Sequence, residues 1–365
     1  MWKDGAYGEL LHELFCTDSV EATKGDIEVS EKQLTEVKWE GTSPATIKRI
    51  MNEGVTTIDQ LLTFTPMELA DKIGSEVSTV EKVIRQAMKE YGLTFKTGTE
   101  VAEEQADRFH ISTGSKNLDR LLKGGVEGNV LTEFIAEFHG GKTQLCKTLG
   151  VIAVNLPPDT PNLPPDKQGR KPNVVYIDCE NTFNAGRVEE IAEARGYDPK
   201  DTLSRFMVAT AWSSLQQAML IKALDVILTD NYVILVIVDG MLSHLRNEYI
   251  GREMLGPRQG SLGAMLGRLL SIADSYKIPV IVTNQVQGNV TGYGPKFTPA
   301  GGHVMAHACT HRVMIKTKSR NAREVQVIDS PNISDAESVR VTITVAGITD
   351  EDGSLGEIME EEISG

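Results

Sequence analysis

The chain has 365 residues, of which 40% are hydrophobic and 24% charged, and its formal net charge is −14. This length exceeds the size at which a single hydrophobic core stops growing, so more than one domain is expected. The acidic balance argues against wholesale binding to nucleic acid or to an anionic membrane, although local basic loops are compatible with it.

Four cysteines are scattered along the chain without a C-x-x-C pairing, at Cys16, Cys146, Cys179 and Cys309. This distribution suits reduced thiols in an intracellular protein. No segment approaches about 18 uninterrupted apolar residues, and the first residues lack a secretory pattern. We therefore expect a cytoplasmic protein, or a nuclear one in a eukaryote, with no membrane partner.

The N-terminal extension, residues 1–30, is mixed and acidic. Its apolar residues Tyr7, Leu10, Leu11, Leu14 and Phe15 fall at helical spacing. This spacing is compatible with a short docking helix, to which no function can be assigned.

Residues 31–92 have a helical pattern with short turns. Two segments within them are alike, because each places a glycine turn, at Gly41 or Gly74, a few residues before an amphipathic helix that carries Lys or Arg. The pair resembles a degenerate helix-hairpin-helix module, which offers turn N–H groups and basic side chains to a DNA backbone. The alternative is a small helical bundle whose lysines are merely solvated.

Residues 93–110 read as a polar linker that holds one isolated aromatic residue, Phe95. An apolar anchor in a polar tether suggests docking into a pocket, for example on a neighbouring subunit. Packing of Phe95 against its own domain is the other interpretation.

From residue 111 to residue 349 the pattern changes to alternating strands and helices. Strands are predicted at residues 130–135, 174–177, 205–209, 232–238, 279–283, 312–317, 325–329 and 339–345. The central runs are continuously apolar, as is typical of buried parallel strands. The repetition predicts a three-layer α/β domain with an antiparallel extension formed by the last three strands. The Pro-rich residues 155–173 are predicted to be an exposed connection, and residues 350–365 an acidic tail.

The first strand of this domain leads into a phosphate-binding pattern, Ala136-x-x-x-x-Gly141-Lys142-Thr143. The turn directs backbone N–H groups inward and the next helix adds its positive N-terminal end, so a polyphosphate fits there. Lys142 would reach the β- and γ-phosphates of a nucleotide, and the Thr143 hydroxyl would ligate Mg²⁺. A glycine-rich strand–helix turn with a solvated lysine is the competing interpretation.

Polar residues end three further strands, at the sheet edge where ligands of such folds bind. Asp239 ends the strongest apolar run and fits a carboxylate that organises Mg²⁺. Glu180 can orient and deprotonate the attacking water, and Gln285 can sense the γ-phosphate. Each could instead be a polar residue that ends a buried strand, but beside the phosphate loop the three together favour catalysis.

Two loops follow strands at the same edge, residues 246–258 and 287–302, and both mix glycine with basic and aromatic residues. Single-stranded DNA binding uses such loops. Loops beside a nucleotide sensor could also become ordered when ATP binds. Since loops are polar in any protein, the residues alone leave this interpretation open.

The histidines His303, His307 and His311 follow i, i+4, i+8 spacing, which could place three imidazoles on one helical face near Cys309. Arg312, however, begins a predicted strand, so the helix is not expected to continue through His311. Metal binding by this cluster is therefore disfavoured.

The assembled motifs resemble the RadA family, the archaeal and eukaryotic type of RecA-like DNA strand-exchange recombinase. The matching stretches lie in order between residues 93 and 348 and include EFHGGKTQ, VVYIDCENTF, LVIVDGMLSHLRNEYIGRE, VIVTNQVQ and VIDSPNISDAE. The resemblance implies a RecA-like P-loop ATPase core with a mainly parallel sheet, preceded by a small all-α helix-hairpin-helix domain. It also implies ATP and Mg²⁺ as cofactors, single- and double-stranded DNA as partners, a helical homo-oligomeric filament, recombination mediators as further partners, and association with the nucleoid.

The resemblance also implies roles at matching positions of the ATP site. Lys142, Glu180 and Gln285 would be catalytic, and Thr143 and Asp239 would hold the metal ion. The nucleotide would contact the phosphate loop and its flanks, an arginine that packs on adenine, and a segment that caps ATP from the adjacent protomer. These residues are Glu137, Phe138, His139, Gly140, Gly141, Lys142, Thr143, Gln144, Arg187, Asp329 and Pro331.

Further roles concern DNA and polymerisation. The two DNA loops and their surroundings would contribute Arg246, Tyr249, Arg252, Arg258 and Lys296. Phe95 and Gly98 would belong to a short polymerisation motif that inserts into the neighbouring core.

The chain departs from the family pattern at several places. Ala136 replaces the first phosphate-loop glycine, His139 is unusual beside phosphates, Gly98 stands where Ala is commoner, and Gly240 stands where Ser is usual. The helix after the first DNA loop carries Gly256, Gly260, Gly263 and Gly267. Three of these are expected inside the helix on one face, each costing about 1 kcal/mol relative to Ala. Either something packs very closely there or the helix is soft.

The leading hypothesis is a DNA-dependent ATPase that polymerises on single-stranded DNA and exchanges it with a homologous duplex. The alternative is a RadA paralogue that binds ATP and DNA but supports other recombinases without exchanging strands. A RecA-like ATPase or helicase acting on other substrates is disfavoured by the N-terminal module and the cap motif.

Overall fold

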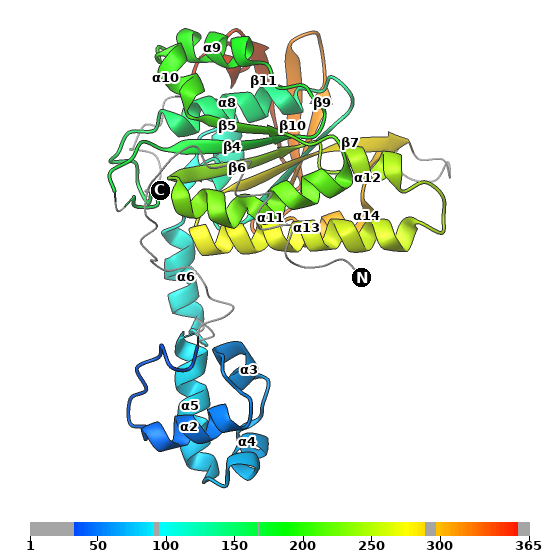
Figure 1. Ribbon diagram of the computed structural model, residues 1–365. Coiled ribbons are helices and arrows are strands. Elements are labelled where there is room, and N and C mark those ends of the chain that lie inside the picture. The colour runs from blue at the N-terminus through cyan, green and yellow to red at the C-terminus, as the bar shows by residue number, and fades with distance from the viewer. Residues whose placement is uncertain (1–32, 91–94, 167, 289–296, 357–365) are drawn as a thin grey trace, which may run out of the picture. The chain divides into compact units, whose positions relative to one another are not determined.

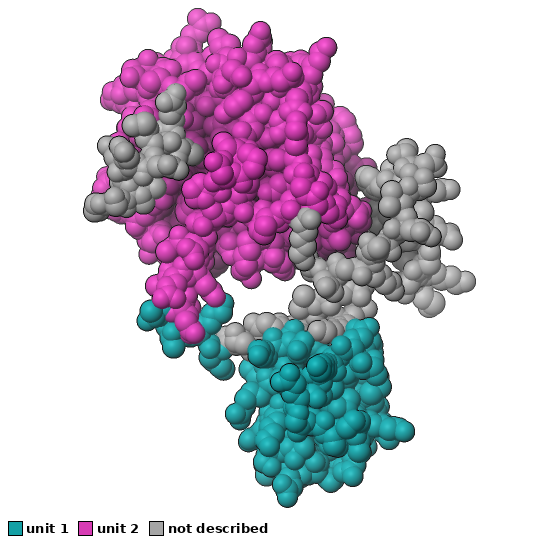
Figure 2. Space-filling model, turned by 90° about the vertical axis from the view of Figure 1, so that its left-hand side faces the viewer, with its two compact units in different colours: residues 1–99 teal, residues 100–365 magenta. Residues whose placement is uncertain are grey.

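The computed structural model describes residues 33–90, 95–166, 168–288 and 297–356. The chain forms two compact units, residues 1–99 and residues 100–365 (Figure 2). The docking helix predicted within residues 1–30 and the DNA-loop residue Lys296 lie outside the described residues. Among the described helices, none is both long enough and apolar enough to cross a bilayer.

The first unit is helical, as predicted, with α2 at Pro44–Asn52, α3 at Ile58–Leu62, α4 at Pro66–Ile73 and α5 at Val77–Glu90 (Figure 1). Both predicted turn glycines take the left-handed backbone, with φ +66° at Gly41 and φ +60° at Gly74. Side-chain caps begin three of the helices, at Ser43, Thr57 and Thr65. A core of its own stabilises the unit, and its fully buried members include Leu34, Ile50, Leu61, Leu69 and Val80.

The predicted linker, residues 93–110, contains a helix that the sequence did not indicate, α6 at Gly98–Ala106. The second unit then opens with a short hairpin, in which β1 at His110–Ile111 pairs antiparallel with β2 at Val126–Glu127. Helix α7 at Lys116–Leu121 lies between these two strands in the chain.

The second unit is built on a ten-stranded, mainly parallel sheet in the order β12-β11-β10-β9-β3-β7-β6-β4-β5, with β8 paired to β7. The strands are β3 at Leu131–Ala136, β4 at Asn173–Asp178, β5 at Phe206–Thr210, β6 at Val233–Asp239, β7 at Val280–Gly288, β8 at Phe297–Pro299, β9 at His311–Thr317, β10 at Ala322–Asp329, β11 at Ser338–Thr344 and β12 at Gly347–Asp350. All eight predicted strands are present, whereas β8 and β12 were not predicted. Strands β9 to β12 are antiparallel to one another, so the predicted antiparallel extension is confirmed.

Helices cover both faces of this sheet (Figure 1). One face carries α8 at Lys142–Val154, α9 at Ala185–Ala194 and α10 at Pro199–Ser204; the other carries α11 at Ser214–Asp230, α12 at Ser243–Glu248, α13 at Leu255–Tyr276 and α14 at Gly302–Ala308. Strand β4 shows why both faces need cover. Tyr176 packs into the core beneath α8, while Val175 and Ile177 point to the core on the opposite face. The α/β three-layer prediction is confirmed.

Two boundaries differ from the predictions. Asp350 was expected to begin the acidic tail, but it ends β12, is buried, and accepts hydrogen bonds from Ser115 and from the backbone N–H of Asn117. The Pro-rich connection is exposed or half-buried, as predicted, yet it is anchored, because the Tyr232 hydroxyl donates to the Pro164 carbonyl (2.6 Å).

The four glycines of α13 lie in a 22-residue helix. Apart from the neighbouring backbone of α13 itself, a Cβ added at Gly256, Gly260 or Gly267 would meet no described atom within 4 Å, and at Gly263 it would approach only the Val304 side chain, at 3.7 Å. Close packing among the described residues therefore does not explain them. The remaining explanations are a soft helix or a partner outside the described residues.

Candidate nucleotide site and adjoining loops

The phosphate loop joins β3 to α8 as the sequence predicts. Gly141 caps the helix with φ +107°, a backbone conformation that favours glycine. Ala136 stands where the pattern has its first glycine, and its methyl group fits because Gly140 has no side chain. A Cβ on Gly140 would lie only 2.5 Å from that methyl group. His139 takes φ +57°, which histidine adopts more often than most residues.

A buried arginine from β10, Arg323, holds this loop from behind, and sequence reasoning missed it. Its Nε donates to the Gly140 carbonyl (2.8 Å), and burial lowers the pKa of its guanidinium. In a trans peptide the C=O and the following N–H point in opposite directions. The bond to Gly140 therefore turns the Gly141 N–H away from Arg323, toward the inner side of the loop.

Lys142 is buried, and its ammonium lies within the loop near the carbonyl oxygens of Ala136 (3.5 Å) and Glu137 (3.4 Å). These long contacts leave the ammonium close to the inward N–H groups, where an anion would be favoured. The exposed Phe138 ring lies against the His139 ring, with centroids 3.9 Å apart.

The predicted metal ligands are brought together. The Thr143 hydroxyl donates to Oδ2 of Asp239 (2.8 Å), which also accepts from Tyr176 (2.6 Å), while Thr283 donates to Oδ1 (2.6 Å). Burial raises the pKa of Asp239, although these three hydrogen bonds oppose the increase. A hydroxyl and a carboxylate are the hard oxygen ligands that Mg²⁺ prefers, so Thr143 and Asp239 fit this ion. Tyr176 and Thr283 were not predicted, since nothing local marks them.

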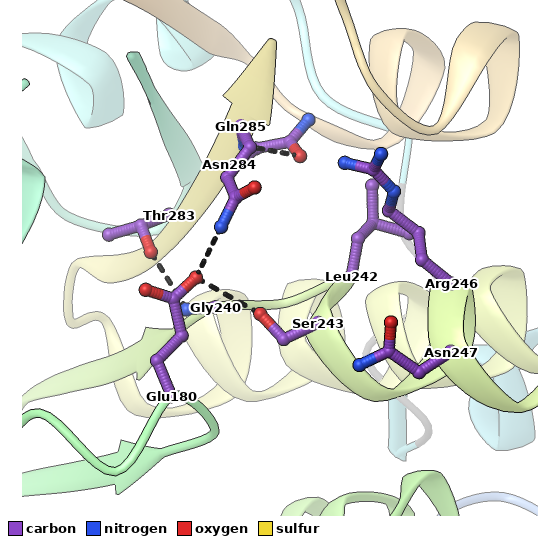
Figure 3. Close-up of a pocket in the computed structure, with 9 residues that line it drawn as sticks. All are labelled: Glu180, Gly240, Leu242, Ser243, Arg246, Asn247, Thr283, Asn284 and Gln285. Atoms are coloured by element: carbon purple, nitrogen blue, oxygen red, sulfur yellow. Dashed lines mark hydrogen bonds between the residues drawn. The ribbon is translucent and has the colours of Figure 1, made fainter. Parts of the chain in front are cut away.

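The predicted catalytic residues Glu180 and Gln285 also meet (Figure 3). The Gln285 amide donates to Oε1 of Glu180 (2.9 Å), and so does the hydroxyl of Ser243 (3.0 Å). The loop that carries Glu180 is fixed by Asp178, which accepts from the backbone N–H of Glu180 (3.1 Å) and of Phe183 (2.7 Å). Ser243 was missed, because it lies on α12 rather than at the end of a strand.

These groups line a pocket of about 300 Å³. Its lining combines nucleotide-side residues with residues of the first predicted DNA segment: Glu180, Gly240, Leu242, Ser243, Arg246, Asn247, Thr283, Asn284 and Gln285. Arg246, predicted to contact DNA, therefore shares a pocket with the predicted catalytic base.

Arg187, the residue predicted to pack on adenine, is held at the start of α9 by several contacts. It donates to the Gln144 side chain (2.9 Å) and to the carbonyls of Thr344 (2.6 Å) and Val345 (2.8 Å). The Arg187 guanidinium thus lies beside α8, next to Gln144, which is also predicted to contact the nucleotide. A second buried cation on α8, Lys147, was not predicted; it donates to the Thr182 carbonyl (3.0 Å).

Asp329 and Pro331 do not join this site. In the sheet register Asp329 pairs with Arg312, which pairs with Glu133, three residues before the phosphate loop starts at Ala136. With a rise of about 3.3 Å per residue, Asp329 lies roughly 10 Å back along the strands, toward the opposite edge of the sheet. Both residues are exposed there.

The segment at Asp329–Pro331 is anchored by His311. The His311 ring forms hydrogen bonds with Ser330 through Nδ1 (3.0 Å) and with Glu127 through Nε2 (2.7 Å). Glu127 also forms a salt bridge with Arg108. His311 lies in β9, outside α14, where His303 and His307 stack 6.0 Å apart. The three-imidazole face is therefore not formed, and the described residues contain no group of three or more potential metal ligands.

The predicted DNA residues differ in exposure. Arg252 is exposed and Arg258 half-buried, whereas Tyr249 packs partly against the core. Beside them, Ile250 is 73% exposed, an apolar side chain that sequence reasoning did not single out.

The predicted polymerisation residue Phe95 is 98% exposed. Gly98 begins α6, and a Cβ there would meet no described atom within 4 Å. Phe95 therefore does not pack against the described residues of its own domain, contrary to the competing interpretation.

Comparisons with known proteins identify the family. The Rad51 family model matches residues 104–351. A protein from Metallosphaera sedula named "DNA repair and recombination protein RadA" is 36% identical over 312 residues, covering 85% of this chain and 94% of its own. A protein of the same name from Aeropyrum pernix is 35% identical over 311 residues, covering 85% and 95%. The chain therefore belongs to the Rad51 family, as a RadA-type member of the RecA-like recombinases.

Proposed function

We propose that this protein is an ATP-dependent DNA recombinase, which polymerises on single-stranded DNA and exchanges it with a homologous duplex in recombinational repair. One observation carries the proposal. Lys142, Asp239 and Glu180 converge at the carboxyl edge of the sheet, and Arg246 of the first DNA segment lines the same pocket as Glu180. A hydrolysis site and a DNA contact are thus adjacent in a member of this family.

Each side chain has a task in hydrolysis that its position supports. Lys142 and the inward N–H groups bind the phosphates, and Arg323 keeps the Gly140–Gly141 peptide turned for that purpose. Glu180 accepts a proton from the attacking water. The Gln285 amide N–H, which donates a hydrogen bond to Glu180 in this structure, donates to the γ-phosphate instead. Thr143 and Asp239 would hold Mg²⁺, which would neutralise charge on the phosphates.

The cap residues act on a neighbouring subunit. Asp329 and Pro331 lie toward the edge opposite the phosphate loop, so they cannot reach the nucleotide of their own chain while the sheet is intact. An exposed polar segment at one edge and an open phosphate loop at the other suit a head-to-tail contact, which repeats into a filament.

Phe95 supports the same assembly. Among the described strands, β5 lies at the edge of the sheet and pairs only with β4. Exposed apolar side chains lie in it and just after it: Val208, Trp212 and Leu215. Unpaired edges bind extended segments of other chains. We place Phe95 of one subunit against this edge of the next.

DNA contacts come from the pocket-side loop and from the helical unit. The exposed Lys48, Arg49, Lys82 and Arg85 follow the two left-handed glycine turns, which suits contact with a phosphate backbone. Arg246, Tyr249, Arg252 and Arg258, with Lys296 in the second loop, bind single-stranded DNA at the core.

The test is ATP turnover by the full chain with and without single-stranded DNA, beside electron microscopy with a non-hydrolysable ATP analogue. Stimulated turnover and helical filaments are expected, followed by exchange of a labelled strand with homologous duplex. Turnover without DNA stimulation, together with no filament, would overturn the proposal. Filaments and turnover without strand exchange would instead favour an accessory RadA paralogue.

Filament assembly has its own control. Phe95→Ala should give short oligomers that still bind ATP weakly. Normal filaments from this variant would show that Phe95 is not the anchor.

A further inference from the structure

We propose that Ser243 is a positioning residue for the Glu180 carboxylate and that it couples DNA contact to ATP hydrolysis. This inference rests on the proposed function and adds to it a route between the two ligands. A hydrogen bond joins Ser243, the first residue of α12, to Glu180, the predicted catalytic base.

The geometry divides the two carboxylate oxygens of Glu180 between different tasks. Ser243 and Gln285 both donate to Oε1, at 3.0 and 2.9 Å, and leave Oε2 to accept a proton (Figure 3). When the Gln285 amide moves to a γ-phosphate, Ser243 is the remaining side-chain donor to Oε1 among the described residues. Ser243 therefore holds the carboxylate in place at the step when its orientation matters.

Gly240 makes this bond possible. A Cβ at residue 240 would lie 2.6 Å from Cγ of Glu180 and 2.7 Å from Oγ of Ser243, and the backbone there has φ +95°. The side chains of Glu180 and Ser243 thus occupy the space that a side chain at residue 240 would need. The serine expected at residue 240 from the family resemblance is absent, and Ser243 supplies a hydroxyl from the next turn instead.

Helix α12 links this hydroxyl to DNA. Ser243 and Arg246 are three residues apart, so they share one face of the helix, and both line the pocket. The helix spans only Ser243–Glu248, and a movement of Arg246 toward a DNA phosphate is transmitted to Ser243 through a single turn. DNA contact thereby fixes the Ser243 hydroxyl, and through it Glu180.

The experiment compares Ser243→Thr with Ser243→Val in the full chain. The two replacements have nearly the same shape and share any effect of a branched side chain on folding, so only the hydroxyl differs. With single-stranded DNA, kcat of Ser243→Val should fall about tenfold below that of Ser243→Thr, as expected when one oriented hydrogen bond is lost from the transition state. The KM for ATP should agree within about twofold, because the proposed role of Ser243 is to orient Glu180 and not to bind the nucleotide.

The ratio of turnover with DNA to turnover without DNA is the second readout. It should remain high in Ser243→Thr and fall in Ser243→Val, while DNA affinity measured with a non-hydrolysable analogue is equal in both. Equal kcat values in the two variants would overturn the positioning role, and equal ratios would overturn the coupling. Failure of the proposed function is distinguishable, since it would appear as unstimulated turnover in the unmodified chain.

Discussion

The carboxyl edge of the central sheet and its amino edge carry different parts of the proposed ATP site. At the carboxyl edge, Lys142, Asp239 and Glu180 are buried or half-buried, and hydrogen bonds of 2.6 to 3.0 Å tie Asp239 and Glu180 to their neighbours. Toward the amino edge, Asp329 and Pro331 are exposed; Asp329 ends β10, where it pairs with Arg312, and the side chain of Ser330 between them is hydrogen-bonded to His311.

The difference follows from what each edge must bind. A phosphate group is small and needs preorganised backbone N–H groups, so its loop is fixed from both sides, by α8 and by Arg323. A segment that binds a neighbouring subunit must be attached firmly to its own chain and must leave its contact residues exposed. In the proposed filament, one chain would therefore carry two complementary half-sites, and its own sheet keeps these two groups of residues apart.

The largest expected effect is at the carboxyl edge. Glu180→Gln should lower kcat about 10²- to 10⁴-fold, because a general base is lost, while ATP binding and filament formation persist. Turnover and nucleotide affinity measured on the same preparation check this. Glu193→Gln, the same change on the exposed side of α9, is the matched control. Loss of ATP binding by Glu180→Gln would show a structural role.

Mixing two inactive variants tests the separation of the half-sites directly. Lys142→Ala removes the phosphate ligand and Asp329→Ala the cap, so each protein alone should be nearly inactive. In a one-to-one mixture about a quarter of the head-to-tail interfaces pair an intact loop with an intact cap, and that share of activity should return. A mixture no more active than its components would place the cap in the chain's own site.

A smaller effect is expected for Arg252→Ala, in the loop beyond the carboxyl edge. Loss of one phosphate contact should weaken DNA binding and reduce the slope of log affinity against log salt concentration by about 1, with ATP binding unchanged. Binding titrations at several salt concentrations measure this. Arg320→Ala, an exposed arginine between β9 and β10, is the control, and an equal loss there would indicate a non-specific charge effect.

The smallest effect on turnover is expected for Glu127→Gln, at the amino edge. Burial alone would raise the pKa of Glu127, but hydrogen bonds from His311 and Arg108 outweigh burial and lower it from 4.5 to about 2. Because the folded-state pKa is depressed, this stabilisation is present above pH 4.5 and is lost as the pH falls toward 2. The variant should lose about 2 kcal/mol of stability at pH 7.

Denaturant unfolding at pH 7 and at pH 3 measures this, and the difference between variant and unmodified chain should shrink at the lower pH. Glu337→Gln, an exposed carboxylate beyond the cap segment, should show no such difference at either pH. A deficit in Glu127→Gln that is independent of pH would mean that the Glu127 charge does not stabilise the folded state.

Much of the core was predictable because its signals are local. Continuous apolar runs mark buried parallel strands, and the residue after such a run lies at the carboxyl edge in any α/β sheet. This is why Thr143, Glu180, Asp239 and Gln285 could be expected to converge. The short strands β8 and β12 and the helix α6 lack such runs or a strong apolar period, and were missed.

Contacts between distant segments were not predictable. Arg323 supports the phosphate loop, Ser243 reaches Glu180 across the space left by Gly240, and His311 binds Glu127; each depends on strand order and register. The register also decided that Asp329 lies away from the phosphate loop of its own chain. The sequence by itself determined which groups this protein has for the proposed binding and cleavage of a nucleotide, because those groups follow local patterns. Only the tertiary structure decided which of them one chain can bring together, because strand pairing sets distances that no local pattern contains.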